Sequence, residues 1–475
     1  MQFPDGIIAV VKRDCPTCEL ADPVLKEIET RGLPLTVYVQ DDPGFPSAAR
    51  VVDDRELEAS FRLDIETVPT LLRFDGGREA ARAIGWHRGD WQALTGLEGL
   101  GAGLPEQRPG CGSKSVEPGI AERLALRYGD VVMPARRIEV ATLEDPVEAC
   151  YERGWSDGLP VVPPTEERVY RMLQGTTRAA DEVVGLAPPN HSPCTVAKVA
   201  INAVMAGCKP EYMPVVLAAV EAAFDPAFCL HGLLATTWFS GPMVVVNGPV
   251  RPAIGMNWRG NVLGQGNRAN ATIGRALQLI VRNVGGGRPQ EADQAAFGTP
   301  VKYGFCFAED ESTPWTSLAE DRGVPRERSA VTLFSADGPI GVADQKSRTP
   351  EPLVDSLAGS LRAVNHYRLG NAADVVIVIG PEHGRVFDQA GWSKADAVAA
   401  LHAATRIEGI DLGMGTDDDA PIAAPAAGGT IPKFREGGIH LVRAGGDAGM
   451  FSAIIPGWLM KGSLGTDPVT REVRT

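Results

Sequence analysis

The chain has 475 residues, of which 22% are charged and 44% are hydrophobic, and this length predicts two or three domains with ample core. The 60 acidic side chains outnumber the 46 basic ones, and the net charge of −14 disfavours a surface for nucleic acid or for an anionic membrane. No run of about 18 apolar residues occurs, and the start of the chain lacks a basic region, so we expect neither a transmembrane helix nor a signal peptide. We therefore expect a cytoplasmic protein, in which the eight cysteines act as thiols, metal ligands or redox centres rather than structural disulfides.

The first hundred residues are predicted to form an acidic domain of their own. They hold 18 acidic and 11 basic side chains, which is half of the net charge of the chain. Apolar runs and helical patterns follow one another in the order βαβαββα, with strands predicted at 7–11, 35–39, 71–74 and 80–84. We place this domain at residues 1–98.

The motif Cys15-Pro16-Thr17-Cys18 follows the first strand and opens the first helix. At this place in a cytosolic protein, the CxxC spacing is a specific sign of redox chemistry. The positive end of the helix macrodipole is expected to lower the pKa of Cys15, while Cys18, one turn later, can resolve a mixed disulfide. Pro69, after Val68, is a candidate cis proline that would expose backbone to a bound substrate beside the dithiol.

Over roughly residues 5–98 the chain resembles the thioredoxin and glutaredoxin superfamily, with matching positions at Cys15, Pro16, Cys18 and Pro69. The resemblance implies a thioredoxin-like fold and thiol–disulfide exchange. Two departures are the missing buried acid in the strand at 7–11 and the absence of a Trp before the first cysteine. An idle dithiol in an adaptor and a metal-binding cysteine pair stay open as alternatives.

A stretch rich in Gly, Pro and small polar residues separates this domain from the rest of the chain. We predict a flexible linker and connecting segment over 99–144, with Cys111 as a candidate shuttle between the two parts. A large α/β domain with a mainly parallel or mixed sheet is predicted over 145–475. Its apolar strands at 243–246, 375–379 and 439–442 lead into Gly-rich loops, where an open sheet places its ligands.

A second candidate thiol is Cys194, which precedes an almost wholly apolar helix. Ser192 as N-cap and Pro193 as first helical residue would put Cys194 in the first turn, with Lys198 on the same face. The helix dipole and Lys198 would favour a thiolate there, and His191 is a candidate general acid or base. The structural alternative is a small packing residue beside a satisfied lysine.

A loop-to-helix junction over 264–272 carries Asn267, Arg268 and Asn270. Backbone amides together with these side chains would hold a carboxylate or phosphate, and ordinary helix capping is the alternative. Glu382 and His383, after the strand at 375–379, are a candidate acid–base pair of the substrate pocket. These features predict a small anionic substrate.

The large domain also carries long strings that resemble a known group. The run 152–165 (ERGWSDGLPVVPPT), the run 267–275 and the run 391–396 (GWSKAD) resemble a largely uncharacterised bacterial family associated with UGSC-motif (seleno)proteins. The resemblance implies that the large domain acts together with redox proteins, but it implies no particular reaction. Trp238-Phe239 stands where a His-Pro pair is expected in that family.

The sequence therefore predicts a thiol-dependent oxidoreductase whose Cys15/Cys18 dithiol serves a cysteine of the large domain, which acts on a small anionic substrate. A thiol reductant or a redox partner protein is implied, with no nucleic acid or membrane, and assembly of like chains stays open. No cofactor beyond the dithiol is required, and a metal is not favoured. Two other hypotheses remain: a cysteine- or metal-dependent hydrolase or lyase with the first domain for assembly, and a redox adaptor without catalysis.

Overall fold

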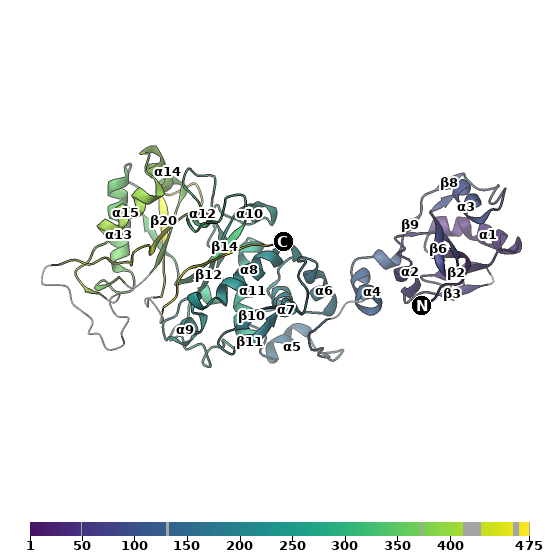
Figure 1. The fold of residues 1–475 in the computed structure, drawn as a ribbon, viewed down its shortest axis with the longest axis horizontal. Coiled ribbons are helices and arrows are strands. Elements are labelled where there is room, and N and C mark those ends of the chain that lie inside the picture. Colours follow the sequence, from purple (N-terminus) through teal and green to yellow (C-terminus); the bar gives the residue numbers. More distant parts are fainter. Residues whose placement is uncertain (49, 130–132, 372–373, 412–428, 459–464, 475) are drawn as a thin grey trace. The chain divides into compact units, whose positions relative to one another are not determined.

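The structure is a computed structural model that describes residues 1–48, 50–129, 133–371, 374–411, 429–458 and 465–474. The chain divides into two compact units, Met1–Val132 (unit 1) and Met133–Thr475 (unit 2), which can be followed by colour in Figure 1. The division falls inside the segment 99–144 that the composition assigns to a linker.

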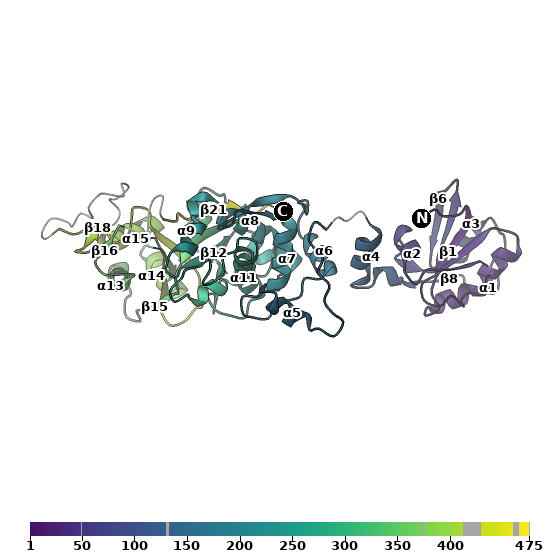
Figure 2. The same cartoon turned by 90° about the horizontal axis from the view of Figure 1, so that it is seen from below.

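Unit 1 is built on a five-stranded mixed sheet in the order β3-β2-β1-β5-β6. The first strand lies at its centre, because β1 pairs in parallel with β2 and antiparallel with β5. Helices α1 and α3 lie on one face of the sheet and α2 on the other (Figure 2), so β1 is buried from Ile7 onward. This βαβ start, with the cysteine pair after β1, is loosely thioredoxin-like.

The elements of unit 1 follow from local patterns of apolar runs and capping residues. Helix α1 begins at Pro16, since proline has the φ of a first helical residue and needs no amide partner there. The bounds are β1 Gly6–Val11, α1 Pro16–Thr30, β2 Leu35–Val39, β3 Val51–Asp53, α2 Glu58–Arg62, β4 Thr67–Val68, β5 Thr70–Asp75, β6 Arg78–Ile84, β7 Trp86–His87, α3 Arg88–Thr95, β8 Gln107–Arg108, β9 Cys111–Gly112 and α4 Ile120–Tyr128.

The segment after α3 packs back onto unit 1. Strand β8 pairs with β7, and β9 pairs antiparallel with β4, the strand that leads into cis Pro69. Thr17 Oγ1 also donates a hydrogen bond to Pro109 O at 2.7 Å. The prediction that Cys111 lies in a flexible linker is therefore wrong, because composition does not show the backbone partners that the folded domain supplies to this segment.

Unit 2 contains two mixed sheets stacked face to face, with helices on both outer sides (Figure 1). The first sheet has the order β13-β12-β14-β21 and the second has the order β15-β20-β17-β19. Alternate residues of a strand point to opposite faces. In β12, Val244 and Val246 pack among the residues of α7, α8 and α11, while Met243 and Val245 pack against residues of the second sheet. The four layers are helix, sheet, sheet and helix.

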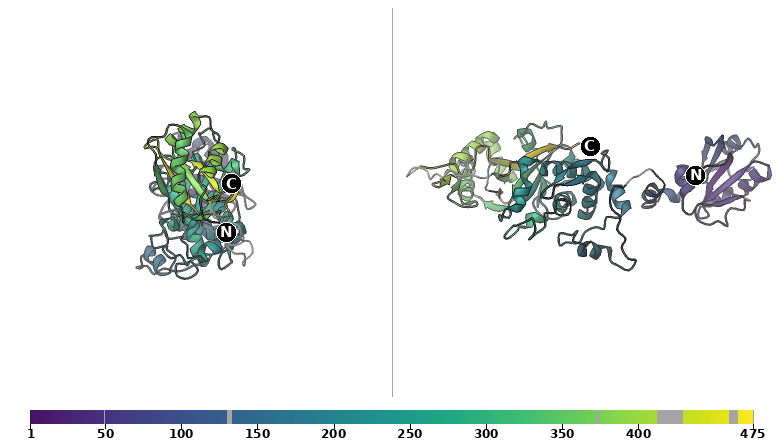
Figure 3. Two further views of the ribbon diagram at one scale, coloured as in Figure 1. Left: turned by 90° about the vertical axis from the view of Figure 1, so that its left-hand side faces the viewer. Right: turned by 60° about the horizontal axis from the view of Figure 1, so that its bottom comes forward.

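Helices α13, α14 and α15 form the outer layer over the second sheet, and the right-hand view of Figure 3 shows them in green. The bounds in unit 2 are α5 Pro146–Glu152, α6 Glu166–Leu173, β10 Val183–Ala187, β11 Ser192–Thr195, α7 Val196–Ala206, α8 Met213–Ala223, α9 Leu230–Ala235, β12 Gly241–Asn247, α10 Val250–Ala253, α11 Arg268–Asn283, β13 Cys306–Ala308, α12 Leu318–Asp321, β14 Ala330–Ala336, β15 Ile340–Ala343, α13 Pro350–Ala363, β16 Leu369–Gly370, β17 Val375–Ile379, α14 Pro381–Gln389, α15 Lys394–Ala404, β18 Ile410–Asp411, β19 Ile439–Arg443, β20 Phe451–Pro456 and β21 Val469–Glu472.

The predicted class, an α/β protein with mixed sheets, is confirmed. The strand expected at 375–379 has the bounds of β17, and the apolar run at 243–246 lies inside β12. Among the described residues, no single helix is long and apolar enough to cross a bilayer. The bent helix pair Pro210–Ala223 and Pro226–Ala235 passes this test by length and composition only.

Candidate functional site

Three cysteine side chains meet at the start of α1. Cys15 is the N-cap residue of this helix, and its Sγ accepts a hydrogen bond from Cys18 N at 3.4 Å. The Cys15 thiol also contacts Val68 O at 3.6 Å, in the strand before cis Pro69. Cys111 lies opposite Val68 in the β4–β9 ladder and shares a thiol hydrogen bond with Cys15. The dithiol predicted at a helix start thus has a third thiol beside it, which sequence reasoning did not place there.

Hydrogen bonds set the acidity of Cys15. Burial raises the pKa of its thiol, but hydrogen bonds from the Cys111 and Cys18 thiols and from backbone amides outweigh burial and leave the pKa below its ordinary value. Burial raises the pKa of Cys18, and the hydrogen bond to Cys15 raises the pKa of Cys111. Of the three sulfurs, that of Cys15 carries a negative charge most readily.

Cys194 lies one residue before the cap of α7 and not in its first turn. Ser192–Thr195 pairs with β10 as strand β11, and Thr195 caps the helix by accepting a hydrogen bond from Lys198 N. The predicted helix start at Ser192 is wrong because this strand pairing holds the backbone extended. Burial raises the pKa of Cys194 to about 12, although Lys198 acts in the opposite direction. His191 is exposed in the turn before the strand. This environment fits the packing alternative.

The polar side chains at the start of α11 bond to the protein itself. Asn267 accepts a hydrogen bond from Asn270 N at 3.0 Å, and Arg268 Nε donates to Gly207 O at 2.9 Å. Asn270 is 4% exposed, and its side-chain amide bonds with the backbone of Asn257 in both directions. These contacts correspond to the capping alternative.

Glu382 and His383 follow β17 as expected, but the predicted acid–base pair is not assembled. His383 is fully buried, and its two ring nitrogens are hydrogen-bonded to Ser452 Oγ at 2.8 Å and to Asp344 O at 3.0 Å. Glu382 accepts a hydrogen bond from Met450 N at 2.5 Å. With both nitrogens engaged by the fold, His383 ties α14 to β20 and has no nitrogen left for a substrate.

A pocket of about 470 Å³ opens where the parallel strands of unit 2 end. Strands β17 and β19 pair in parallel, and their carboxyl ends lead to Pro381 and to Gly445-Gly446 in the pocket wall. Asp310 and residues 312–314, which follow β13, line the pocket together with Arg259. Both sheets deliver the ends of parallel strands to this place, which is where a sheet of this type binds its ligands.

Arginine and aspartate side chains alternate around this pocket. Arg443 pairs with Asp388 at 2.8 Å, and Arg385 pairs with Asp447 at 2.6 Å. Arg259 is exposed, and within the described part of the chain no carboxylate or carbonyl engages its guanidinium. Sequence reasoning missed Arg259 because the stretch around it has no strand or helix pattern.

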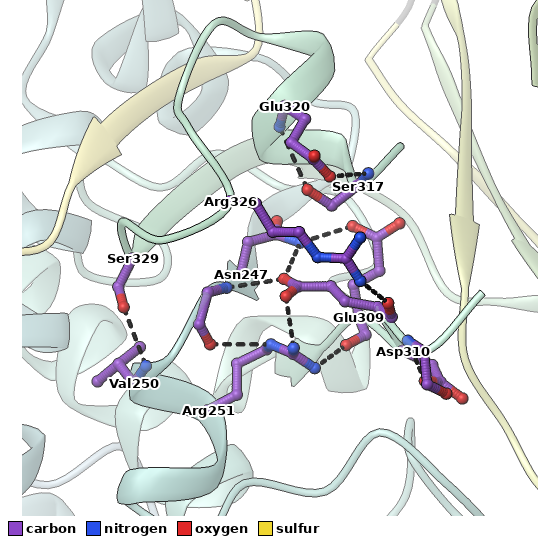
Figure 4. A network of polar contacts seen from close by, with 12 residues as sticks. Asn247, Val250, Arg251, Glu309, Asp310, Ser317, Glu320, Arg326 and Ser329 are labelled. Atoms are coloured by element: carbon purple, nitrogen blue, oxygen red, sulfur yellow. Dashed lines mark hydrogen bonds and ion pairs between the residues drawn. The ribbon is translucent and has the colours of Figure 1, made fainter. Parts of the chain in front are cut away.

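A buried polar network lies beside the pocket, where β12 and β13 end (Figure 4). Arg251 pairs with Glu311 at 2.5 Å and also donates to the carbonyl of Glu309. Asn247 Nδ2 donates to Glu309 at 2.6 Å and to Glu311 at 3.0 Å. Since Asp310 of the pocket wall lies between these two glutamates, the network holds the backbone of the wall in place.

Glu309 makes the stability of unit 2 depend on pH. Burial raises the pKa of its carboxyl to about 7, against the opposing effect of Lys394 and of hydrogen bonds from Leu318 N and Asn247. The folded state binds this proton more tightly than the unfolded chain, whose glutamate titrates near 4.5. We expect Glu309 to contribute stability at low pH that is lost as pH rises from about 4.5 to about 7, by on the order of 1–3 kcal/mol.

Urea unfolding of the wild type and of Glu309→Gln across this pH range measures the effect. The unfolding free energy of the variant should fall less steeply with rising pH than that of the wild type. A residual slope should remain from Asp337, because burial raises the pKa of its carboxyl to about 6. Equal slopes in the two proteins would contradict the prediction.

Among the residues that the structure describes, no group of three His, Cys, Asp or Glu side chains is arranged to hold a metal ion. Comparison of the chain with protein-family models, with curated proteins and with solved structures found no match.

Proposed function

We propose that unit 1 is a thiol–disulfide exchange domain of the thioredoxin and glutaredoxin type, with Cys15 as its nucleophile. One observation carries the proposal: the Cys15 sulfur caps α1 and accepts hydrogen bonds from thiols and amides, which favour the thiolate. The thiolate is the form that attacks a disulfide.

In the proposed reaction, the Cys15 thiolate attacks a disulfide and forms a mixed disulfide, while one thiolate leaves. A second cysteine then attacks Cys15 Sγ, which closes an internal disulfide and releases the second thiolate. Two electrons pass from the protein to the external disulfide, and a thiol reductant returns them. Cys18 is the second cysteine that the CxxC spacing favours.

The experiment is the release of glutathione from glutathione disulfide by the reduced full-length protein. The wild type should release both glutathione molecules, whereas Cys15→Ser should close no internal disulfide and release at most one.

For unit 2 we propose that the pocket at the strand ends binds a small anionic molecule. The guanidinium of Arg259 supports this, because no carboxylate or carbonyl of the described residues engages it, and its planar array of N–H donors is suited to a carboxylate or phosphate. The N-terminal end of α14, which begins at Pro381 in the pocket wall, adds a favourable dipole. The small anionic substrate expected from the sequence is thereby assigned to this pocket rather than to the start of α11.

Thermal unfolding of the full-length protein with phosphate and with a series of mono- and dicarboxylates tests the pocket. At least one anion should raise the Tm of the wild type, and Arg259→Gln should weaken its binding at least about tenfold through loss of a charge-assisted hydrogen bond. Arg268→Gln, at the start of α11, is the matched control and should keep the shift. Loss of the shift in Arg268→Gln but not in Arg259→Gln would move the site back to α11.

For unit 2 we propose a reaction in a redox setting. The resemblance of residues 152–443 to the bacterial family associated with UGSC-motif proteins supports a redox setting. Exchange of Cys15 with Cys194 stays a prediction, since Cys194 is buried and its pKa is raised to about 12.

A further inference from the structure

The strand that carries Cys111 covers the dithiol. Cys15 is 1% exposed and Cys18 is fully buried, whereas Cys111 is partly exposed. Cys111 is therefore the member of the cluster that solvent reaches. An external disulfide that approaches the folded domain meets the Cys111 sulfur before it meets that of Cys15.

Two side-chain hydrogen bonds hold the segment that carries Cys111 against the dithiol motif. Lys12 Nζ, before the motif, donates to Gly112 O at 2.9 Å, and Thr17 Oγ1, inside it, donates to Pro109 O at 2.7 Å. These side chains bond to the backbone on both sides of Cys111. The segment is thus bound specifically against the thiols.

Close packing at Gly110 supports the same conclusion. A Cβ atom there would lie 2.4 Å from Thr67 Cγ2 and 2.6 Å from Val68 O, closer than such atoms can approach. Only glycine lets the segment lie flat on β4, and this contact places Cys111 opposite Val68, whose carbonyl also contacts the Cys15 thiol. The sulfurs of Cys15 and Cys111 therefore lie close together beside Val68, and they share a hydrogen bond.

We propose that Cys111 is the thiol through which Cys15 exchanges with external disulfides, and that a Cys15–Cys111 bond is the first internal disulfide to form. This inference rests on the exchange activity proposed for unit 1. It assigns Cys18 to a later step, because Cys18 is fully buried and has no surface from which to meet an incoming disulfide.

The steps balance with an external disulfide, R–S–S–R, as oxidant. Cys111 attacks one sulfur and forms Cys111–S–S–R, while one RS⁻ leaves. The Cys15 thiolate then attacks Cys111 Sγ, which forms the Cys15–Cys111 bond and releases the second RS⁻. The two thiols of the protein lose two electrons to the external disulfide, and their two protons end on the two RS⁻ groups. Attack of Cys18 on Cys15 Sγ afterwards moves the bond to Cys15–Cys18 and frees Cys111.

Disulfide mapping after oxidation of the full-length protein with one equivalent of glutathione disulfide tests the inference. In Cys18→Ser, peptide mass spectrometry without reduction should find Cys15 joined to Cys111. In Cys111→Ser, glutathione release should be slower than in the wild type by at least about tenfold, because the exposed entry thiol is lost. Cys229→Ser removes a partly exposed thiol of unit 2 and should keep the wild-type rate.

A second measurement checks that unit 1 of Cys111→Ser is still folded. The unfolding midpoint of unit 1 in urea should change little, since serine keeps a hydroxyl at the same place in β9. An unchanged rate in Cys111→Ser, or a Cys18→Ser protein that stops at a glutathione adduct, overturns the inference and leaves the exchange activity of Cys15 standing. A wild-type protein that releases no glutathione overturns the proposed function itself.

Discussion

Cys15→Ser is expected to slow the release of the second glutathione, the step that closes the internal disulfide, by at least about a hundredfold, the largest effect of any single substitution in unit 1. A serine hydroxyl stays protonated at neutral pH and forms no disulfide, so the step that closes the internal bond is lost. Cys18 cannot replace Cys15 in this step, because Cys18 is fully buried and its pKa is raised.

The pH dependence of the wild-type rate adds a second readout. Because the pKa of Cys15 lies below its ordinary value, 9.0, the step that consumes its thiolate should reach its plateau at lower pH than for a free cysteine. Cys194→Ser should behave as the wild type, since that thiol is buried and its pKa is raised to about 12. Release of the second glutathione at the wild-type rate in Cys15→Ser would show that another thiol closes the internal disulfide.

Arg251→Ala is expected to lower the unfolding free energy of unit 2 by about 3–5 kcal/mol. The side chains of Arg251 and Glu311 are only 11% and 9% exposed, so the substitution leaves a buried carboxylate without its partner. The carbonyl of Glu309 loses its donor at the same time. Urea unfolding of the full-length protein, followed by circular dichroism, measures the change.

Two control variants distinguish the loss of a buried ion pair from the loss of an arginine charge at the surface. Arg328→Ala breaks a pair with Glu472 in which the arginine side chain is 59% exposed, and it should cost less than about 1 kcal/mol. The double variant Arg251→Met with Glu311→Leu should recover most of the loss, because it leaves no unpaired buried charge. Equal losses in Arg251→Ala and Arg328→Ala would show that burial of the pair does not decide its contribution.

The N-terminal fold was predictable because its signals are local. Pro16 after a strand starts a helix, the CxxC spacing puts two thiols one turn apart, and alternating apolar runs outline the sheet. Cys111 was not predictable as a neighbour of Cys15, because β9 reaches β4 only when a long segment folds back. No local pattern records a pairing of two short strands that are far apart in the chain.

In unit 2 the buried strands and the loops after them were predictable, since apolar runs followed by glycines depend only on neighbouring residues. Only the tertiary structure decided which polar groups near those loops are already engaged. His383 and Asn270 are bonded within the fold, whereas Arg259 lines a pocket and has no carboxylate or carbonyl partner among the described residues. The physical reason is that a buried polar group takes its partner from whatever element packs against it, and that partner comes from elsewhere in the chain. Residue types and spacing thus predicted the strands and loops that surround the candidate sites, and long-range packing decided which side chains there are already hydrogen-bonded.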